Sequence, residues 1–250
     1  MPAKKLLILG GTGEAAELAR LVVEMMPQLD VTVSYAGVTG HQPDLPCHKR
    51  IGGFGGPEGL ITYMTQEEID YLIDATHPFA ERISMSAYVA SNALKCPVLA
   101  FKRPPWVPQL KDKWLEVANM ADAVETVARL GQATFLTIGV KELSAFADIP
   151  DVDFLVRLIN EPKEKLPLAN YKTVIGRPPF DVEDDRKLIR DHKIRLLVTK
   201  NSGGDQTISK LEAARLEGIA VIMIERPAPE PMEEAFDFKY VLQWLSAHGA

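Results

Sequence analysis

The sequence has few cysteines, and the two present, Cys47 and Cys96, lie far apart in the chain. A zinc site or a redox pair needs cysteine or histidine ligands at close spacing. Neither cysteine has such a neighbour, so the sequence contains no recognisable metal-binding motif. We expect two reduced, partly buried thiols and no metal site.

The chain also lacks long hydrophobic runs and an excess of positive charge. No apolar stretch approaches the roughly 18 residues that span a bilayer, and the first residues lead into a strand-like run rather than a secretory signal. The sequence therefore predicts a cytoplasmic protein without a membrane anchor. The net charge of −6 argues against a general nucleic-acid binder. It still permits a polyanionic small molecule, because local basic clusters decide that kind of binding.

Two common catalytic motifs are missing. None of the tyrosines has a lysine four residues later, which excludes the Tyr-x-x-x-Lys pair of short-chain dehydrogenases. No serine lies in a Gly-x-Ser-x-Gly elbow, which argues against an α/β-hydrolase.

Strand-like and helix-like segments alternate along the whole chain, which predicts an α/β fold with mainly parallel sheets and crossover helices. We expect strands at 5–9, 31–34, 47–51, 71–74, 98–101, 134–138, 154–158, 173–175, 196–199 and 221–224. We expect helices at 14–26, 66–69, 83–94, 120–130, 141–147, 182–191, 209–217 and 238–247.

The two halves of the chain end alike. Each ends with a helix, a Gly or Pro stop, a buried strand and an Arg-Pro pair, at Arg103-Pro104 and at Arg226-Pro227. Proline cannot extend a central strand, so each pair marks where the chain leaves a sheet. The repeat favours two domains, 1–102 and 103–250, although ordinary βα organisation would also produce it.

The strongest local motif follows the first strand. Gly11, Gly13 and Ala16 form a Gly-x-Gly-x-x-Ala pattern between a buried strand and an apolar-periodic helix. In this context the glycines permit a tight turn and close backbone approach to a pyrophosphate, which the helix N-terminus attracts. We expect the backbone of Gly10, Gly11, Thr12 and Gly13 to hold a dinucleotide.

The end of the second strand indicates which dinucleotide. NAD-preferring sites usually carry Asp or Glu there to bind the ribose hydroxyls, whereas this strand ends in Ser34 and Tyr35. The missing acid favours NADP. No cation follows directly, since Val38 and Thr39 come next; Lys49 and Arg50 are candidates, although both fit equally well as plain surface charges.

Two further segments of the first half carry residues suited to a site. The glycine-rich run at 52–59 would serve a close backbone approach, a lid, or only a connector. Thr76 and His77 follow a buried strand at the edge where α/β proteins bind ligands. His77 would act as a proton donor near neutral pH or merely cap the next helix.

The second half has a comparable strand end. Lys200, Asn201 and Ser202 precede two glycines after a buried strand, which makes a plausible anion cradle, and Lys141 follows another strand end. Each of these residues, taken singly, is more often an ordinary surface group. Their repetition at strand ends favours a binding role.

In this order, the motifs resemble the precorrin-6A reductases of cobalamin biosynthesis. The resemblance rests on residues 8–14, 52–56, 73–80, 103–106 and 200–204. The Asp-Ala-Thr-His-Pro-Phe-Ala block at 74–80 is the most specific of them. One departure is Val38, where we expect a basic residue in many relatives.

The resemblance implies two Rossmann-like domains with the active site in the cleft between them, and NADPH-dependent reduction of precorrin-6A to precorrin-6B. Hydride would go to C19 and a proton to C18 of the macrocycle. Ser34, Tyr35, Thr76 and His77 would line the cofactor. Lys141, Lys200, Asn201 and Ser202 would bind the tetrapyrrole, with His77 and Lys200 as catalytic candidates. No metal is required, and transient contacts with neighbouring pathway enzymes are compatible with this role.

Two alternatives remain at this point. A non-catalytic NADP-sensing protein would share the glycine motif but would not bind a tetrapyrrole. A methyltransferase using S-adenosylmethionine can have a similar first loop. However, that cofactor has no pyrophosphate and is normally held by an acid after the second strand, where this chain has Ser34 and Tyr35.

Overall fold

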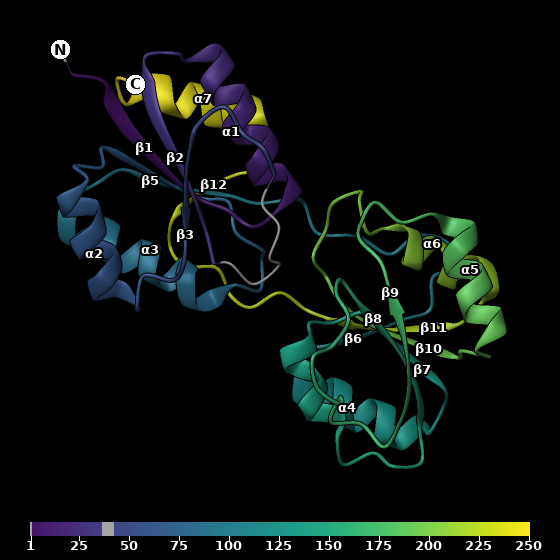
Figure 1. Cartoon of the computed structure of the whole chain (residues 1–250). Helices are drawn as coiled ribbons and strands as arrows, with labels where there is room; N and C mark the ends of the chain where they lie inside the picture. The colour runs from purple at the N-terminus through teal and green to yellow at the C-terminus, as the bar shows by residue number, and fades with distance from the viewer. Residues whose placement is uncertain (1, 37–42) are drawn as a thin grey trace. The chain divides into compact units, whose positions relative to one another are not determined.

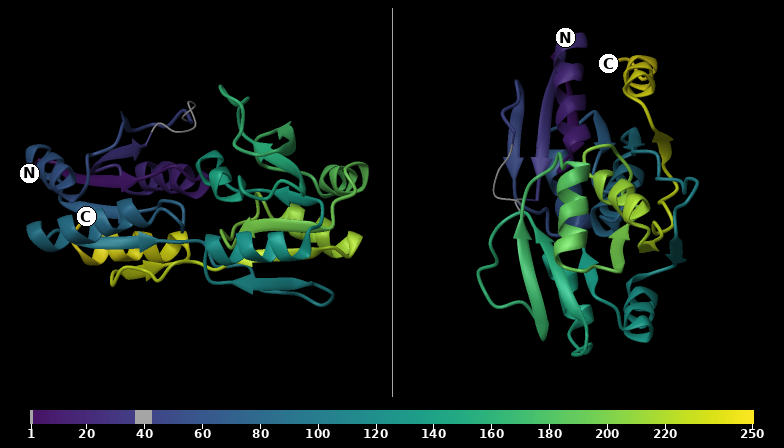
Figure 2. Two further views of the ribbon diagram at one scale, coloured as in Figure 1. Left: turned by 90° about the horizontal axis from the view of Figure 1, so that it is seen from below. Right: turned by 90° about the vertical axis from the view of Figure 1, so that its right-hand side faces the viewer.

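The computed structural model describes residues 2–36 and 43–250, and it divides the chain into two compact units. The first unit comprises Met1–Arg103 together with Pro227–Ala250, and the second comprises Pro104–Arg226. Figure 1 labels most helices and strands of both units, and Figure 2 shows the units from two further directions. Within the described residues, no helix combines the length and apolar character needed to cross a bilayer.

The first unit is a parallel six-stranded sheet in the order β12-β5-β4-β1-β2-β3. Its strands are β1 (Lys4–Leu9), β2 (Leu29–Tyr35), β3 (His48–Ile51), β4 (Tyr71–Asp74), β5 (Val98–Phe101) and β12 (Glu233–Ala235). Its helices are α1 (Gly13–Met25), α2 (Pro57–Gln66), α3 (Glu81–Leu94) and α7 (Phe238–Ala247).

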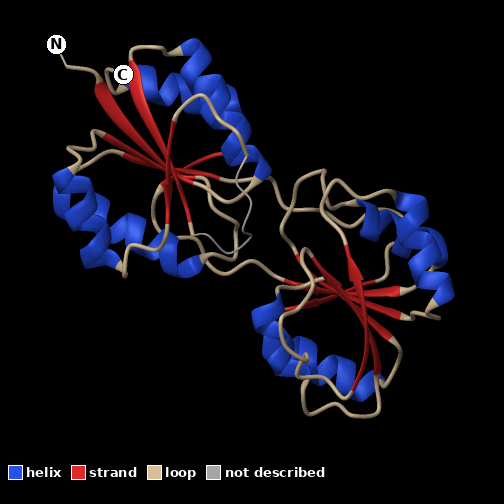
Figure 3. Ribbon diagram, viewed as in Figure 1, coloured by secondary structure: helices blue, strands red, loops and turns tan. Residues whose placement is uncertain are grey.

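Helices cover both faces of this sheet, as Figure 3 shows. Because successive side chains of a strand point to opposite faces, β1 serves two cores. Leu6 and Ile8 pack in one core with buried residues of α1 and α7. Leu7 and Leu9 pack in the other with buried residues of α2 and α3. The continuous apolar run of β1 thus identifies a strand buried on both sides.

The second unit repeats this plan with the strand order β6-β11-β10-β7-β8-β9, again all parallel. Its strands are β6 (Trp114–Val117), β7 (Thr134–Leu136), β8 (Asp153–Leu158), β9 (Asn170–Ile175), β10 (Leu196–Lys200) and β11 (Ala220–Ile224). Its helices are α4 (Met120–Leu130), the 3-10 helix η1 (Val140–Phe146), α5 (Val182–Asp191) and α6 (Ser209–Glu217).

The chain crosses between the units before each of the edge strands β6 and β12. After β5 the chain leaves the first sheet, and the next strand, β6, pairs with β11 of the second. After β11 the chain returns, and β12 pairs with β5 of the first. The first sheet therefore receives its edge strand β12 from a segment that follows the whole second unit in the sequence, whereas β6 is the first strand of that contiguous second unit.

The place of β12 corrects the expected domain division. The boundary near residue 103 agrees with the structure, but assigning all of 103–250 to the second domain was wrong, because 227–250 supplies β12 and α7 to the first unit. The helix expected at 66–69 was also wrong. The helix is α2, Pro57–Gln66, which begins inside the glycine-rich run with proline in its first turn, a favourable proline position.

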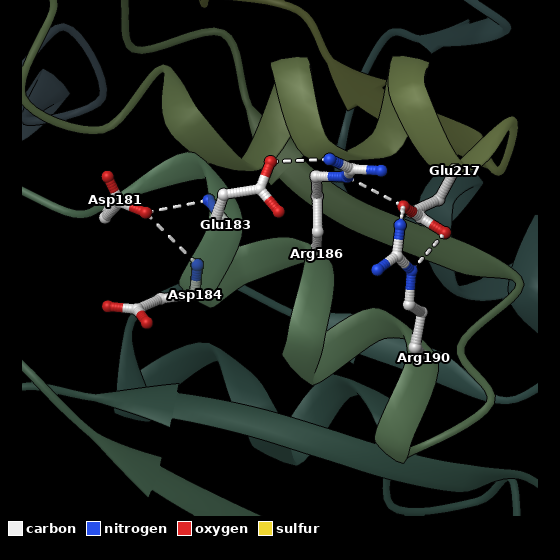
Figure 4. A network of polar contacts seen from close by, with 6 residues as sticks. All are labelled: Asp181, Glu183, Asp184, Arg186, Arg190 and Glu217. Carbon is white, nitrogen blue, oxygen red and sulfur yellow. Dashed lines mark hydrogen bonds and ion pairs between the residues drawn. The ribbon is translucent and has the colours of Figure 1, made fainter.

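A charged network joins α5 to α6 in the second unit (Figure 4). Asp181 caps α5 by accepting hydrogen bonds from the amides of Glu183 and Asp184. Glu217, at the end of α6, accepts from Arg186 and Arg190. These hydrogen bonds, with that of Arg190 the largest, lower the pKa of Glu217. The network links the two helices, although ion pairs at a protein surface contribute little stability.

Candidate functional site

The glycine turn of the first unit has the geometry that its sequence predicts. The Gly10 amide donates a hydrogen bond to the Ser34 carbonyl, 2.8 Å away, which fixes the start of the turn against β2. A Cβ on Gly10 would lie 2.9 Å from Val33 Cγ1, so any larger residue would force the buried Val33 side chain to shift. Gly11 has a φ of +122°, a backbone conformation that favours glycine. Gly11 and Gly13 are exposed, so their backbone is accessible to a ligand.

Thr12 lies within this turn and is the N-cap of α1. Its hydroxyl accepts a hydrogen bond from the Ala15 amide at 3.1 Å, which caps the helix. The same hydroxyl donates to the Ala75 carbonyl at 3.0 Å. The amides of the first helical turn precede the first intrahelical hydrogen bonds and therefore point out of the helix end, where they attract an anion. This arrangement fits a dinucleotide pyrophosphate.

Asp74 organises the loop that carries the next two candidates. Its carboxylate is 1% exposed. One oxygen accepts hydrogen bonds from the amide and the hydroxyl of Thr76, at 3.1 and 2.5 Å. The other accepts from the Ser84 hydroxyl on α3, at 2.6 Å. Asp74 thereby ties Thr76 to the helix that follows.

His77 is exposed beside Thr76. Its Nδ1 accepts a hydrogen bond from the Phe79 amide at 3.2 Å, and its carbonyl accepts one from Ala80 at 2.7 Å. Since Nδ1 is an acceptor here, the proton of a neutral ring lies on Nε2. His77 thus shapes the turn before α3, and its role as an acid stays a prediction.

Ser34 and Tyr35 end β2, as expected, and both are buried. The Ser34 hydroxyl lies 3.3 Å from Nη1 of Arg50, its register partner on β3. The Tyr35 hydroxyl has no hydrogen-bond partner among the described residues, and burial raises the pKa of this phenol. The segment containing Val38 and Thr39 lies outside the described residues.

The sheet order explains why these side chains gather. Strands β4, β1 and β2 are adjacent and parallel, so their carboxyl ends lie at one edge of the sheet. That edge therefore combines the turn of Gly10, Gly11, Thr12 and Gly13 with Ser34 and Tyr35 on one side and Thr76 and His77 on the other. It is the edge where doubly wound sheets bind nucleotides.

An ion pair lies next to the Gly10–Gly13 turn. Glu14, in the first turn of α1, pairs with Arg103, whose Nη1 lies 3.3 Å from both carboxylate oxygens. An acid in a first helical turn is favourable for the helix but would repel a bound phosphate. The guanidinium of Arg103 offsets that charge.

The second unit brings its predicted residues together in the same way. Strands β7 and β10 are adjacent, with Lys141 in η1 after β7 and Lys200 at the end of β10. Lys200 forms an ion pair with Glu142. The other carboxylate oxygen of Glu142 accepts from the Gly139 amide at 3.2 Å. Lys141 is exposed.

Asn201 has a structural task that the sequence did not indicate. Its side chain accepts a hydrogen bond from the Trp106 amide at 2.8 Å and donates one to the Trp106 carbonyl at 3.0 Å. Its own carbonyl accepts from Nε of Arg226, also at 2.8 Å. Asn201 therefore anchors the segment that enters the second unit. The neighbouring Ser202 is buried.

The sequence alone did not indicate the roles of Asp74 and Glu142 or the pairing of Glu14 with Arg103. The Gly-x-x-Glu spacing from Gly139 to Glu142 was a usable signal, because it matches the geometry in which an acid three residues on accepts from the cap amide. Asp74 ends a buried strand, where a carboxylate without partners would be costly. The position of Asp74 therefore predicts a hydrogen-bonded carboxylate, but it does not indicate which residues are the donors.

Two parallel sheets with helices on both faces, one of them with a glycine turn before its first helix, define a protein of the Rossmann-like class. The family model for the precorrin-6x reductases CbiJ/CobK matches residues 5–246. The chain belongs to this family, as the sequence motifs predicted.

The similarity extends along the whole chain. It is 40% identical over 246 residues to the precorrin-6A reductase of Rhodobacter capsulatus, covering 98% of this chain and 97% of that protein. It is 43% identical over 234 residues to the precorrin-6A reductase of Rhodococcus erythropolis, covering 93% of each. A solved structure named CobK precorrin-6A reductase has a TM-score of 0.93 and 40% identity, covering 99% of this chain and 98% of that one. The fold and the family together imply a nicotinamide cofactor, and the turn at Gly10–Gly13 fits one.

Proposed function

We propose that this protein reduces precorrin-6A to precorrin-6B with NADPH, with hydride added at C19 and a proton at C18. The observation that carries the proposal is the edge of the first sheet, where the Gly10–Gly13 turn lies beside Thr76 and His77. Family membership supplies the reaction class.

The end of β2 favours NADPH over NADH. Asp or Glu at this position would bind the ribose hydroxyls of NADH and repel a 2′-phosphate. Ser34 and Tyr35 stand there instead, and a guanidinium lies within 3.3 Å of the Ser34 hydroxyl. The positive charge of this guanidinium suits the additional phosphate of NADPH.

The residues of the chain would bind and orient rather than carry out covalent steps. Backbone amides at the start of α1 would hold the pyrophosphate, and Thr76, fixed by Asp74, would position the nicotinamide beside His77. When bound, the nicotinamide supplies the hydride. In the second unit, Lys141 and Lys200, with Asn201 and Ser202, would hold carboxylates of the macrocycle.

A metal-free substrate is the better candidate. The two relatives named above, at 40% and 43% identity, are called precorrin-6A reductases. A relative called cobalt-precorrin-6A reductase, from Priestia megaterium, is 27% identical over 235 residues. The greater similarity to the first group favours precorrin-6A without cobalt.

Anaerobic incubation of the protein with NADPH and precorrin-6A tests the proposal. We expect the pigment's absorption to change, a product two mass units heavier, and loss of NADPH absorbance in equal amount. Parallel titrations with NADPH, NADH and S-adenosylmethionine separate the alternatives. Tight NADPH binding without turnover would favour a sensor, and S-adenosylmethionine binding without NADPH binding would favour a methyltransferase; either result contradicts the proposal.

The substitution His77→Ala distinguishes a role of His77 as proton donor from a role only in shaping the turn before α3. If His77 supplies the proton, single-turnover reduction slows by about 10²- to 10⁴-fold, while NADPH binding changes little. An unchanged rate would remove His77 from the chemistry and leave it the turn contact with Phe79.

A further inference from the structure

The glycine-rich run after β3 encloses an arginine side chain. Arg50, the third residue of β3, is half-buried. Its Nη1 donates to the Gly52 carbonyl and its Nη2 to the Gly53 carbonyl, the latter at 3.0 Å. Its guanidinium lies 3.8 Å from the ring centroid of Phe54, a distance at which cation–π attraction is substantial.

The surrounding chain fixes this arrangement. The Phe54 ring packs edge-on against Tyr63 of α2, with centroids 5.3 Å apart, and the Arg50 guanidinium is also 5.0 Å from the Tyr63 ring. Gly52 has a φ of +124°, which a side chain at this position would strain, and this turn presents its carbonyl to Arg50. In this structure the carbonyls of the run therefore hold the Arg50 guanidinium in place.

The Arg50 guanidinium lies beside the end of β2, the position at which a doubly wound sheet binds the adenosine ribose of a dinucleotide. Ser34 and Arg50 are register partners at the carboxyl ends of β2 and β3. In a doubly wound sheet, a dinucleotide held at the first glycine turn places its adenosine ribose at the end of the second strand. That turn is attached to the same strand end, since the Gly10 amide donates to the Ser34 carbonyl.

The guanidinium keeps donors for a ligand. Of its five N–H groups, three are accounted for by Ser34, Gly52 and Gly53 in the described part of the chain. The remaining two belong to the planar fork that matches phosphate oxygens. Because the protein already holds the side chain in place, binding an anion would immobilise little further.

We propose that Arg50 binds the 2′-phosphate of NADPH and is the residue that makes the enzyme prefer NADPH to NADH. The proposal rests on NADPH being the cofactor, as proposed above. The absence of an acid at Ser34 only permits NADPH to bind, whereas Arg50 would actively favour NADPH over NADH. The proposal also gives the glycine-rich run a function, because that run holds the guanidinium beside the ribose position.

Equilibrium binding of NADPH and NADH to the full chain tests this. Arg50→Gln removes the charge and keeps much of the side-chain length. We expect NADPH affinity to fall about 10- to 100-fold, as for loss of a charge-assisted hydrogen bond, with NADH affinity changed less than about twofold. The matched control is Lys49→Gln, because Lys49 is directed to Pro43 and Asp44 instead; it should leave both affinities unchanged.

Two fragments of the cofactor, one with the 2′-phosphate and one without it, test the contact between Arg50 and that phosphate alone. Wild type should bind 2′,5′-ADP more tightly than 5′-AMP, and Arg50→Gln should abolish that difference. Arg50→Lys, which keeps the charge but not the fork, should give an intermediate NADPH affinity; it also serves if Arg50→Gln does not fold. Equal weakening of NADPH and NADH would make Arg50 structural and overturn the proposal.

The outcomes separate this inference from the proposed function. If wild type prefers NADPH and Arg50→Gln keeps that preference, the assignment to Arg50 is wrong while the NADPH-dependent reductase stands. If wild type binds NADH as tightly as NADPH, both the NADPH preference and the role of Arg50 are wrong.

Discussion

Thr12 Oγ1 donates a hydrogen bond to the carbonyl oxygen of Ala75, 3.0 Å away, while capping α1 through the Ala15 amide. One hydroxyl thereby joins the turn proposed to bind the pyrophosphate to the loop that carries Thr76 and His77. The two halves of the candidate cofactor site are positioned against each other by this contact, not only by the sheet beneath them.

Thr12→Ala should lower the free energy of unfolding by about 1–2.5 kcal/mol, because it removes a helix cap worth about 1 kcal/mol and a hydrogen bond of similar value. Urea denaturation measures the change. NADPH affinity should fall as well. Thr12→Ser keeps the hydroxyl and should stay within about 0.5 kcal/mol of wild type; an equal loss in both variants would mean that the methyl group, not the hydroxyl, matters.

Asp74 is the second point on which the His77 loop depends. In Asp74→Asn the oxygen that accepts from Thr76 loses its charge, and the new amide nitrogen faces the Ser84 hydroxyl, which must turn to accept instead of donate. Hydrogen bonds to a charged group are stronger than neutral ones, so we expect a loss of about 1–3 kcal/mol in urea denaturation. Ser84→Ala, which removes only one of the three donors, should cost less. Equal stability of Asp74→Asn and wild type would show that the buried carboxylate is not needed.

Lys200 and Glu142 allow a test of the substrate site. If Lys200 binds a substrate carboxylate, Lys200→Gln should raise KM for precorrin-6A by about tenfold or more. Glu142→Gln should lower KM or leave it unchanged, since it removes the negative charge that competes for Lys200. Lys187→Gln, an exposed substitution on α5, is the control. If KM rises equally in the first two variants, the pair is structural.

Much of the first unit could be predicted from its sequence because its signals are local. The apolar run of β1, the glycines after it and the helical periodicity of α1 lie within twenty-five residues, so pattern and structure agree. The Asp-Ala-Thr-His block likewise ends a buried strand at the edge where ligands bind. Most of the candidate cofactor-binding residues lie in these segments.

The rest depended on contacts between distant residues. Strand β6 reads Trp-Leu-Glu-Val and β12 reads Glu-Glu-Ala; both are short edge strands, which carry little of the alternating apolar signal. Strand β6 pairs with β11, and β12 pairs with β5. Both partners are distant in the sequence, so no local pattern indicates the pairing. The position of Arg50 beside Ser34 depends on the register of β2 and β3, and therefore the sequence left Lys49 and Arg50 as equal alternatives.

Cys96 provides a pH-dependent test of the first core. The side chain is 8% exposed, and its Sγ lies 3.3 Å from the Asp70 carbonyl oxygen. Burial, and then the charge of Asp70, raise the pKa of this thiol from 9.0 to about 11. A raised pKa means that the native state keeps its proton while the unfolded chain loses it. The contribution to stability is complete below pH 9 and is lost as the pH rises toward 11.

We therefore expect the free energy of unfolding of wild type to fall more steeply between pH 9.0 and about pH 11 than that of Cys96→Ala, which has no thiol to titrate. Urea denaturation at several pH values measures both slopes. Cys47→Ala is the control at the other free thiol, which is half-buried. In native protein at pH 8, iodoacetamide should modify Cys47 faster than Cys96, since the thiolate is the reacting form and access is greater. Parallel slopes together with rapid labelling of Cys96 would show that this thiol is accessible to solvent in the folded state.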